Sequence, residues 1–300
     1  MRTYLDCYPC FLKQALRAGR IATDDEKKIK RLLDEVGMML RNIPLESIPP
    51  ESARLIYHKV SEITGNLDPY REIKSESTKK ALSLYPSLKS QVEKSNDKLL
   101  TSIRIAIAGN VIDFGPNWDF DLEDEIDEVL EKDFAICDYG GFKDCLDEAR
   151  EILYIGDNAG ECVFDRILIE EMKKPVIYAV RDVPVINDAT YEDAVQAGID
   201  KVATILSSGA DGPGAILKRC SSEFKKVYDN SKFIISKGQG NYEALSNERR
   251  PIFFLLKVKC HVIANDIGVD EGDIVLKGSC GREERCETPP YSDGPACRRE

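Results

Sequence analysis

From Ile152 onward, short apolar runs alternate with amphipathic helical patterns, and this alternation constrains the fold more than any other feature of the chain. Helical patterns at 161–173, 191–197 and 213–228 separate the apolar runs, which are typical of buried strands. Strand, helix and strand at this spacing indicate right-handed crossovers between parallel strands. We therefore predict an α/β fold with a mainly parallel, doubly wound sheet, whose strands lie at 152–155, 176–180, 202–206, 233–236, 253–258 and 273–276.

The first hundred residues show apolar side chains at helical spacing. Helices are predicted over 24–39, from Pro50 onward, over 69–92 with an interruption at Pro86, and over the Ala- and Ile-rich run 99–111. Two acidic helices are expected at 123–131 and 142–151. The segment after Gly278 carries no hydrophobic periodicity. The expected organisation is a helical region at 1–100, an α/β core at 101–278 and a loosely ordered tail at 279–300.

The composition indicates a globular protein and disfavours membrane and nucleic-acid partners. Of the 300 residues 42% are hydrophobic and 32% are charged, which suits a globular chain rather than a disordered one. No apolar run is long enough to span a membrane and no signal-peptide pattern opens the chain, so we expect a cytoplasmic protein that does not bind membranes. The formal net charge of −11 disfavours nucleic acid as a partner and is compatible with hard cations. The sequence carries no signature of oligomeric state.

Polar and glycine-rich segments follow five of the predicted strands, at the edge where open α/β sheets bind ligands. Asp157, Asn158 and Asp188 offer oxygen ligands suited to Mg²⁺, Mn²⁺ or a similar divalent cation. The chain holds only two histidines, His58 and His261, so a histidine-based zinc site is poorly supplied. The structural alternative is that the two aspartates cap helices and that Asn158 serves a turn.

Two further segments suit a phosphoryl group. Lys237 is a cation in a glycine-flanked loop, and Ser207, Ser208 and Gly209 are small residues that can present backbone amides to an anion. A divalent cation, a lysine and backbone amides are the groups with which proteins bind and activate a phosphoryl group.

Six segments, taken in order, resemble the DUF89 or damage-control phosphatase family, and most closely its standalone prokaryotic branch with an N-terminal Cys-x-x-Cys. They lie at 7–16, 108–115, 156–161, 187–190, 237–241 and 259–260, and the resemblance spans about residues 1–278. It implies a helical region on a Rossmann-like three-layer α/β core. It also implies a metal-dependent phosphatase that acts on small phosphorylated metabolites, often sugar phosphates or damaged cofactor intermediates.

The resemblance further implies roles for single residues. The metal ligands of the family, an Asp-Asn pair and a later Asp, fall on Asp157, Asn158 and Asp188. The Lys-Gly motif that the family associates with phosphate binding falls on Lys237 and Gly238. A segment that lines the family's cleft falls on Asn110 and Asp113.

The expected reaction is hydrolysis of a phosphate monoester. A bound Mn²⁺, Mg²⁺, Co²⁺ or Ni²⁺ would polarise phosphorus, Lys237 and the amides near Ser207 would neutralise charge, and water would attack in line. Asp113 or Glu161 is the candidate carboxylate that assists this water, and a covalent route through an aspartate is an open alternative. The rival functions are S-adenosylmethionine-dependent carboxyl methyl transfer and metabolite binding without catalysis.

Cys7 and Cys10 form a single Cys-x-x-Cys pair that admits three interpretations. The pair is structural, or redox-active, or half of a zinc site. The redox interpretation is disfavoured because the pair does not follow a βαβ pattern. Completing zinc ligands would come from Cys260, His261, Cys280 or Cys286.

Overall fold

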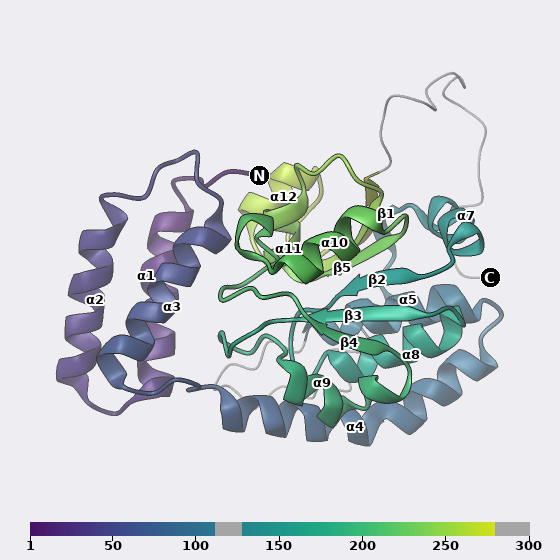
Figure 1. The fold of residues 1–300 in the computed structure, drawn as a ribbon, viewed down its shortest axis with the longest axis horizontal. Helices are drawn as coiled ribbons and strands as arrows, with labels where there is room; N and C mark the ends of the chain where they lie inside the picture. Colours follow the sequence, from purple (N-terminus) through teal and green to yellow (C-terminus); the bar gives the residue numbers. More distant parts are fainter. Residues whose placement is uncertain (112–127, 280–300) are drawn as a thin grey trace.

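The computed structural model describes residues 1–111 and 128–279, which form a layered α/β core beside a unit of three helices (Figure 1). Seven strands of the described residues make one sheet in the order β1-β7-β6-β5-β2-β3-β4. Neighbouring strands are parallel except for β6 and β7, so the predicted mainly parallel sheet is confirmed. The strands are β1 (Phe134–Cys137), β2 (Ile152–Ile155), β3 (Val176–Val180), β4 (Thr204–Ser207), β5 (Ile234–Lys237), β6 (Ile252–Lys257) and β7 (Ile274–Ser279).

Helices cover both faces of the sheet, as the three-layer expectation requires (Figure 1). Successive residues of β2 point to opposite faces: Ile152 and Tyr154 join one hydrophobic cluster, and Leu153 and Ile155 join the other. The first cluster holds residues of α4 (Arg71–Lys94), α5 (Lys98–Ala108), α7 (Tyr139–Glu148), α8 (Cys162–Met172) and α9 (Tyr191–Ala197). The second holds residues of α10 (Ser222–Asn230), α11 (Gly238–Leu245) and α12 (His261–Ile267).

Three further helices, α1 (Cys7–Ala22), α2 (Glu26–Leu40) and α3 (Pro49–Thr64), pack on one another around a separate hydrophobic cluster. We call them the helical cap; they stand at the left of Figure 1. Asp25 caps α2 by accepting hydrogen bonds from the next turn, and Pro49 opens α3 at a position where its missing N–H costs nothing. The predicted helical region 1–100 therefore packs in two places, because α4 and α5 lie on the sheet.

Several boundaries differ from the predicted ones for local reasons. The strands at 152–155 and 176–180 are confirmed, whereas β4 begins at Thr204 because a 3-10 turn occupies Ile199–Lys201. The helix expected at 213–228 begins only at Ser222, since Gly214 has a φ of +76° that a helix cannot include. Strand β1 was not predicted, although its four residues Phe134–Cys137 form a short apolar run; it is only partly buried. The helix at 123–131 and the tail at 279–300 lie mostly outside the described residues.

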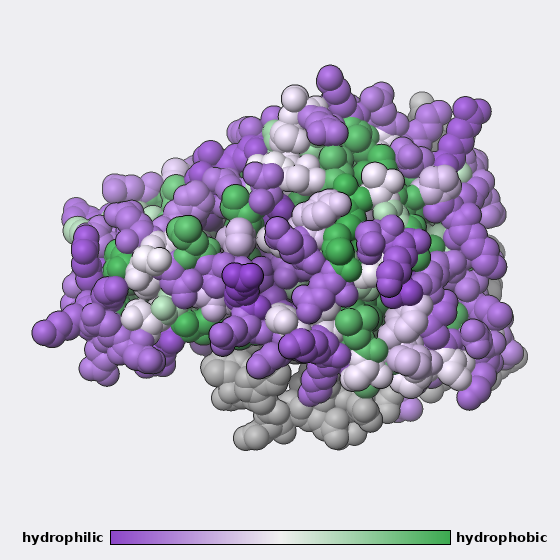
Figure 2. All heavy atoms as spheres, turned by 60° about the horizontal axis from the view of Figure 1, so that its bottom comes forward, coloured by the Kyte–Doolittle hydropathy of each residue, from purple (hydrophilic) through white to green (hydrophobic). Residues whose placement is uncertain are grey.

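The outside of the molecule is mostly polar on the face that Figure 2 shows, where hydrophobic side chains form limited groups between hydrophilic ones. Within the residues that the structure describes, no helix is both long and apolar enough to cross a membrane.

Candidate active site

Three loops meet at the carboxyl ends of β2, β3 and β5. Strand β2 has β3 on one side and β5 on the other, so the chain changes its direction of travel across the sheet here and leaves a crevice at the strand ends. Backbone hydrogen bonds tie two of the loops together, from Ala189 N to Asp157 O at 2.7 Å and from Ala159 N to Asn187 O at 2.9 Å. An isolated β-bridge joins Asn158 to Asp188.

A cavity of about 640 Å³ lies between these loops and the helical cap. The three predicted metal ligands, Asp157, Asn158 and Asp188, all line this cavity, and we call them its wall. The cap contributes part of α1 and α3, including Lys13, Gln14, Arg17 and Tyr57. Helix α11 and the segment after β6 contribute Gln239, Glu243, Lys259 and Cys260 to the lining.

Arg181, at the end of β3, holds the two aspartates of this wall. Its Nε donates to Asp188 Oδ2 at 2.6 Å, and its Nη2 lies 3.7 Å from Asp157 Oδ1. Nη2 also donates to Asn241 Oδ1 at 3.2 Å, which fixes the guanidinium to helix α11. Arg181 is only 1% exposed, so these pairings occur away from solvent, where unpaired charge is costly.

Lys237 lies beneath the wall rather than on it. Its ammonium donates to Ala106 O at 2.8 Å, Glu161 Oε1 at 2.8 Å and Asp165 Oδ1 at 2.6 Å, which uses all three of its protons. Burial lowers its pKa, but the charges of Asp165 and Glu161 outweigh burial and raise it above the ordinary value. Lys237 is not among the described residues that line the cavity, so this geometry offers no support for the predicted contact with phosphate.

Glu161 organises the amides around the wall. Its Oε2 accepts from Asn110 Nδ2, from Asn158 N and from Asn158 Nδ2, each at 3.2 Å. Asn158 Nδ2 also lies 3.3 Å from Asp157 Oδ2, so its nitrogen is committed and its Oδ1 is the atom left for a ligand. Glu161 is fully buried and already saturated with donors, which favours a positioning role over proton transfer to water.

The charges of this region are suited to a divalent cation. Four buried carboxylates, those of Asp157, Glu161, Asp165 and Asp188, face two buried cations, and full ionisation leaves a net charge of −2. Burial, followed by the charges of Asp188 and Glu161, raises the pKa of Asp157 well above its usual range. Burial also raises the pKa of Asp188, although Arg181 opposes the shift.

A second observation agrees with a cation at this place. Asn110 donates through Nδ2 to Asp157 Oδ2 at 3.2 Å, while its own buried Oδ1 has no hydrogen-bond partner among the described residues. No three His, Cys, Asp or Glu side chains in residues 1–111 and 128–279 converge as a ready ligand cluster. A cation at this place would have two carboxylates and one or two amide oxygens as donors, which suits hard cations.

Of the other predicted site residues that the structure describes, Gly238 lies at the wall, whereas Ser207, Ser208 and Gly209 do not line the cavity. The Ser208 amide donates to Val180 O of the neighbouring strand β3 at 2.8 Å, and the Gly209 amide donates to Ser207 Oγ at 3.1 Å, so neither amide supports the predicted anion site. Asp113 lies outside the described residues. Gly238 lies directly against the Asp157 carboxylate, where any side chain would collide with it.

The two cysteines of the N-terminal pair lie on the first turn of α1 and line the cavity together with Cys260 and His261. All three thiols are free, and burial raises the pKa of Cys7 and of Cys260. The described residues offer no converged cluster for a metal at this place. Cys280 and Cys286 lie outside the described residues.

Arg181, Asp165 and Asn241 are site residues that strand-end reasoning did not select. Asp165 had a detectable signal, because it is a charged residue within the apolar pattern of the 161–173 helix. Asn241 joins the loops by donating to Gly156 O at 3.0 Å and Lys237 O at 2.7 Å, a pairing that depends on tertiary structure alone.

The sequence matches the damage-control phosphatase ARMT1-like domain over residues 3–275. The chain belongs to this family. Among the relatives of this ARMT1-like protein, a damage-control phosphatase of Archaeoglobus fulgidus is 34% identical over 281 residues, which cover 90% of this chain and 97% of the relative. A damage-control phosphatase of Pyrococcus horikoshii is 34% identical over 283 residues, with 92% and 97% covered. An uncharacterized protein of Methanocaldococcus jannaschii is 36% identical over 284 residues, with 90% and 93% covered.

The fold comparison agrees with the family assignment. A crystal structure of a DUF89 family protein from Pyrococcus horikoshii superposes on this ARMT1-like protein with a TM-score of 0.86 at 34% sequence identity. The match covers 93% of this chain and 99% of the other. The resemblance predicted from the six sequence segments is therefore confirmed for both family and fold.

Glu243 on the cavity wall makes the stability of this ARMT1-like protein depend on pH. Burial raises its pKa from 4.5 to about 7, against the opposing effect of the hydrogen bond from Gln239. The unfolded chain therefore releases this proton first as the pH rises, and the folded state loses stability between about pH 4.5 and pH 7. We expect Glu243→Gln to unfold at higher denaturant concentration than wild type at pH 8. In urea titrations, the gain in free energy of unfolding of Glu243→Gln over wild type should be about 2 kcal/mol larger at pH 8 than at pH 5. An equal gain at both pH values would contradict the raised pKa of Glu243.

Proposed function

We propose that this chain is a divalent-metal-dependent phosphatase that hydrolyses phosphate monoesters of small metabolites. The observation that carries the proposal is the wall of Asp157, Asn158 and Asp188, which faces a cavity of substrate size and belongs to a buried cluster of four carboxylates and two cations. Two relatives with 34% identity are named damage-control phosphatases, and this supports the reaction class. In the proposed assignment, Asp157, Asn158 and Asp188 hold the cation.

The protein side chains divide the work around that cation. When bound, the cation would supply Lewis-acid polarisation of the phosphoryl group. Arg181 keeps both aspartates in place, and Glu161 turns the Asn158 oxygen toward the cavity by holding its amide nitrogen. Lys237 balances the charge of Glu161 and Asp165 from below.

Phosphate oxygens would meet a second set of cations on the cavity surface. Lys13 and Arg17 enter the cavity from α1, and Lys259 enters it from the segment after β6. These side chains lie on the lining itself, whereas Lys237 is sealed behind it. We therefore assign the electrostatic recognition of the phosphoryl group to the cavity surface.

The test uses protein freed of metal with a chelator and then supplied with Mn²⁺, Mg²⁺, Co²⁺ or Ni²⁺. Hydrolysis of p-nitrophenyl phosphate and of sugar phosphates is expected with at least one cation and is expected to stop when chelator returns. Asp157→Ala should lower kcat/KM at least about 100-fold. Asp182→Asn is the control, since Asp182 is an exposed residue of the loop that carries Asp188 and its carboxylate accepts only from Ser207 Oγ among the described contacts.

Two results would contradict the proposed phosphatase function. Wild type and Asp157→Ala equally inactive with every cation and ester would exclude the phosphatase. Binding of S-adenosylmethionine by the metal-free protein in calorimetry, without ester hydrolysis, would favour the methyl-transfer alternative.

A further inference from the structure

Ile186 precedes Asn187 and Asp188 in the loop after β3 and has an unusual backbone. Its φ is +42°, a left-handed conformation that is an outlier for a β-branched residue. Among the described residues other than glycine, only Lys173 also has a positive φ, and Lys173 is the C-cap of α8, where this conformation is common. The conformation at Ile186 has no such ordinary explanation.

The outlier lies inside a tight turn. Asp188 N donates to Val185 O at 3.0 Å, which makes Ile186 the second residue of a four-residue turn. Glycine, asparagine or aspartate normally supplies a positive φ at this position. Asn187 follows directly, yet the left-handed conformation falls on isoleucine. Strained backbone of this kind persists only where the surrounding structure holds it in place.

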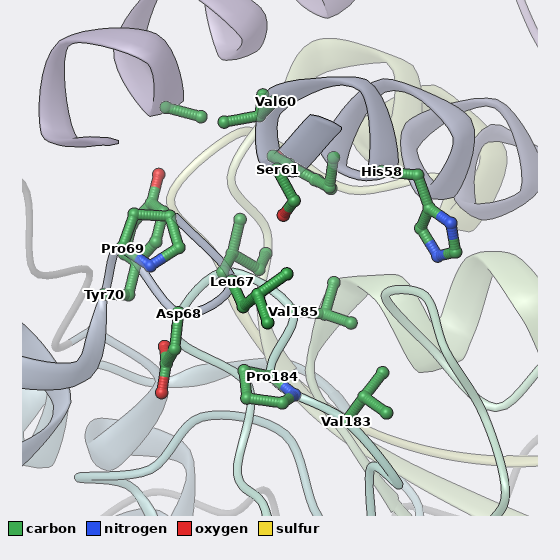
Figure 3. Close-up of a pocket in the computed structure, with 13 residues that line it drawn as sticks. His58, Val60, Ser61, Leu67, Asp68, Pro69, Tyr70, Val183, Pro184 and Val185 are labelled. Carbon is green, nitrogen blue, oxygen red and sulfur yellow. The ribbon is translucent and has the colours of Figure 1, made fainter. Parts of the chain in front are cut away.

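The helical cap provides that hold. The Ile186 side chain packs against the hydrophobic cluster of the cap, as the Tyr57 side chain does. It also stands between the main cavity and a second cavity of about 310 Å³, both of which include Tyr57, Tyr70 and Ile186 in their lining. Figure 3 shows the second cavity, in which Val183, Pro184 and Val185 of this loop lie opposite His58, Val60 and Ser61 of α3.

The other side of the turn is bonded to the wall of the main cavity. Asn187 O accepts from Ala159 N at 2.9 Å, and Asp188 forms the β-bridge with Asn158. Ala189 N donates to Asp157 O at 2.7 Å. The turn that contains Ile186 is therefore bonded directly to the segment of Asp157 and Asn158, and its shape sets where Asp188 meets that segment.

We propose that Ile186 is a positioning residue, through which a seated helical cap fixes Asp188 against Asp157 and Asn158. Contact with the cap fixes the Ile186 side chain, which in turn keeps the backbone of residues 185–188 in the observed turn. This turn determines the position of the Asp188 carboxylate. The assignment rests on the proposed function, because that function gives the three residues their cation. It makes the assembly of the cation site depend on contact with the cap.

The test compares Ile186→Gly with Ile186→Val. Glycine adopts the turn without strain but deletes the contact with the cap, whereas valine keeps a β-branched side chain in contact. In metal-free protein, hydrogen exchange at the amides of Asp188 and Ala189 is expected to become roughly tenfold faster in Ile186→Gly. Mn²⁺ affinity and kcat with p-nitrophenyl phosphate should each fall roughly tenfold. Ile186→Val should stay within about threefold of wild type in all three measurements.

Lys173→Gly is the matched control, because it changes the other left-handed residue at an exposed helix end. It should leave exchange in the turn, Mn²⁺ affinity and kcat unchanged. Wild-type behaviour of Ile186→Gly would overturn the proposal, since the turn alone would then suffice. Faster exchange spread uniformly over cap and core would also overturn it, because that result marks global destabilisation. If the wild type hydrolyses no ester, the proposed function fails, while the metal-free exchange experiment still decides the role of Ile186.

Discussion

Gly238→Ala is expected to abolish cation binding and to lower kcat/KM at least about 100-fold. A Cβ at this position would lie 1.9 Å from Asp157 Oδ2 and 2.4 Å from its Cγ, far inside contact distance. The carboxylate has little room to retreat, because it is buried among Asn110, Asn158 and Arg181. The measurements are Mn²⁺ calorimetry and p-nitrophenyl phosphate hydrolysis.

Gly65→Ala separates this collision from backbone strain. Gly65 has a φ of +78°, almost the same as the +76° of Gly238, but a Cβ on Gly65 meets no atom within 4 Å. Both variants should lose about 1–2 kcal/mol of stability, since alanine is strained in the left-handed region. Only Gly238→Ala should lose the cation. Equal Mn²⁺ affinity in the two variants would show that Asp157 is not a ligand.

Lys237→Met is expected to destabilise the fold by about 3–5 kcal/mol, because it leaves Glu161 and Asp165 buried without a counter-charge. The loss should shrink as the pH falls. Burial already raises the pKa of Asp165 in the wild type, and removal of Lys237 takes away the charge that opposes this shift. The carboxylate is then protonated at higher pH, which relieves the buried charge. Urea titrations at pH 8 and pH 5 measure the difference.

A second substitution tests the cause of this loss. Adding Glu161→Gln to Lys237→Met removes one of the stranded charges, so the double variant should be more stable than the sum of the two single changes predicts. Additive losses would refute the buried ion pair. A stable Lys237→Met protein with a raised KM for esters would instead support the phosphate contact predicted from sequence.

Much of the sheet was predictable because buried parallel strands are continuous apolar runs. The segments at 152–155 and 176–180 are the interior strands β2 and β3, and both were predicted with the observed bounds. Strand β1, which pairs with β7 alone at the sheet edge, was not predicted although its four residues are apolar. The antiparallel direction of β7 is a property of the connection after α12 that apolar patterning does not encode.

The site was predictable only to the extent that it is made from strand ends. Asp157, Asn158 and Asp188 were placed together by one rule about parallel sheets, and the structure gathers them on one wall. The same rule put Lys237 on the cavity surface, although its side chain turns inward to two carboxylates of the helix after β2. A position at the end of a strand does not determine the direction of the side chain, and that direction separates a phosphate ligand from a buried counter-ion.

The helical cap and the sheet contribute to the cavity from independent hydrophobic clusters. The buried charges belong to the sheet side, whereas Lys13, Gln14 and Arg17 reach the cavity from α1. Substitutions at these α1 positions would therefore leave the ion pairs of Arg181 and Lys237 in place. Under the proposed function, the choice of metabolite would be free to diverge between homologues while the cation site stays constant, and a library randomised on α1 alone would be the starting point for redirecting it.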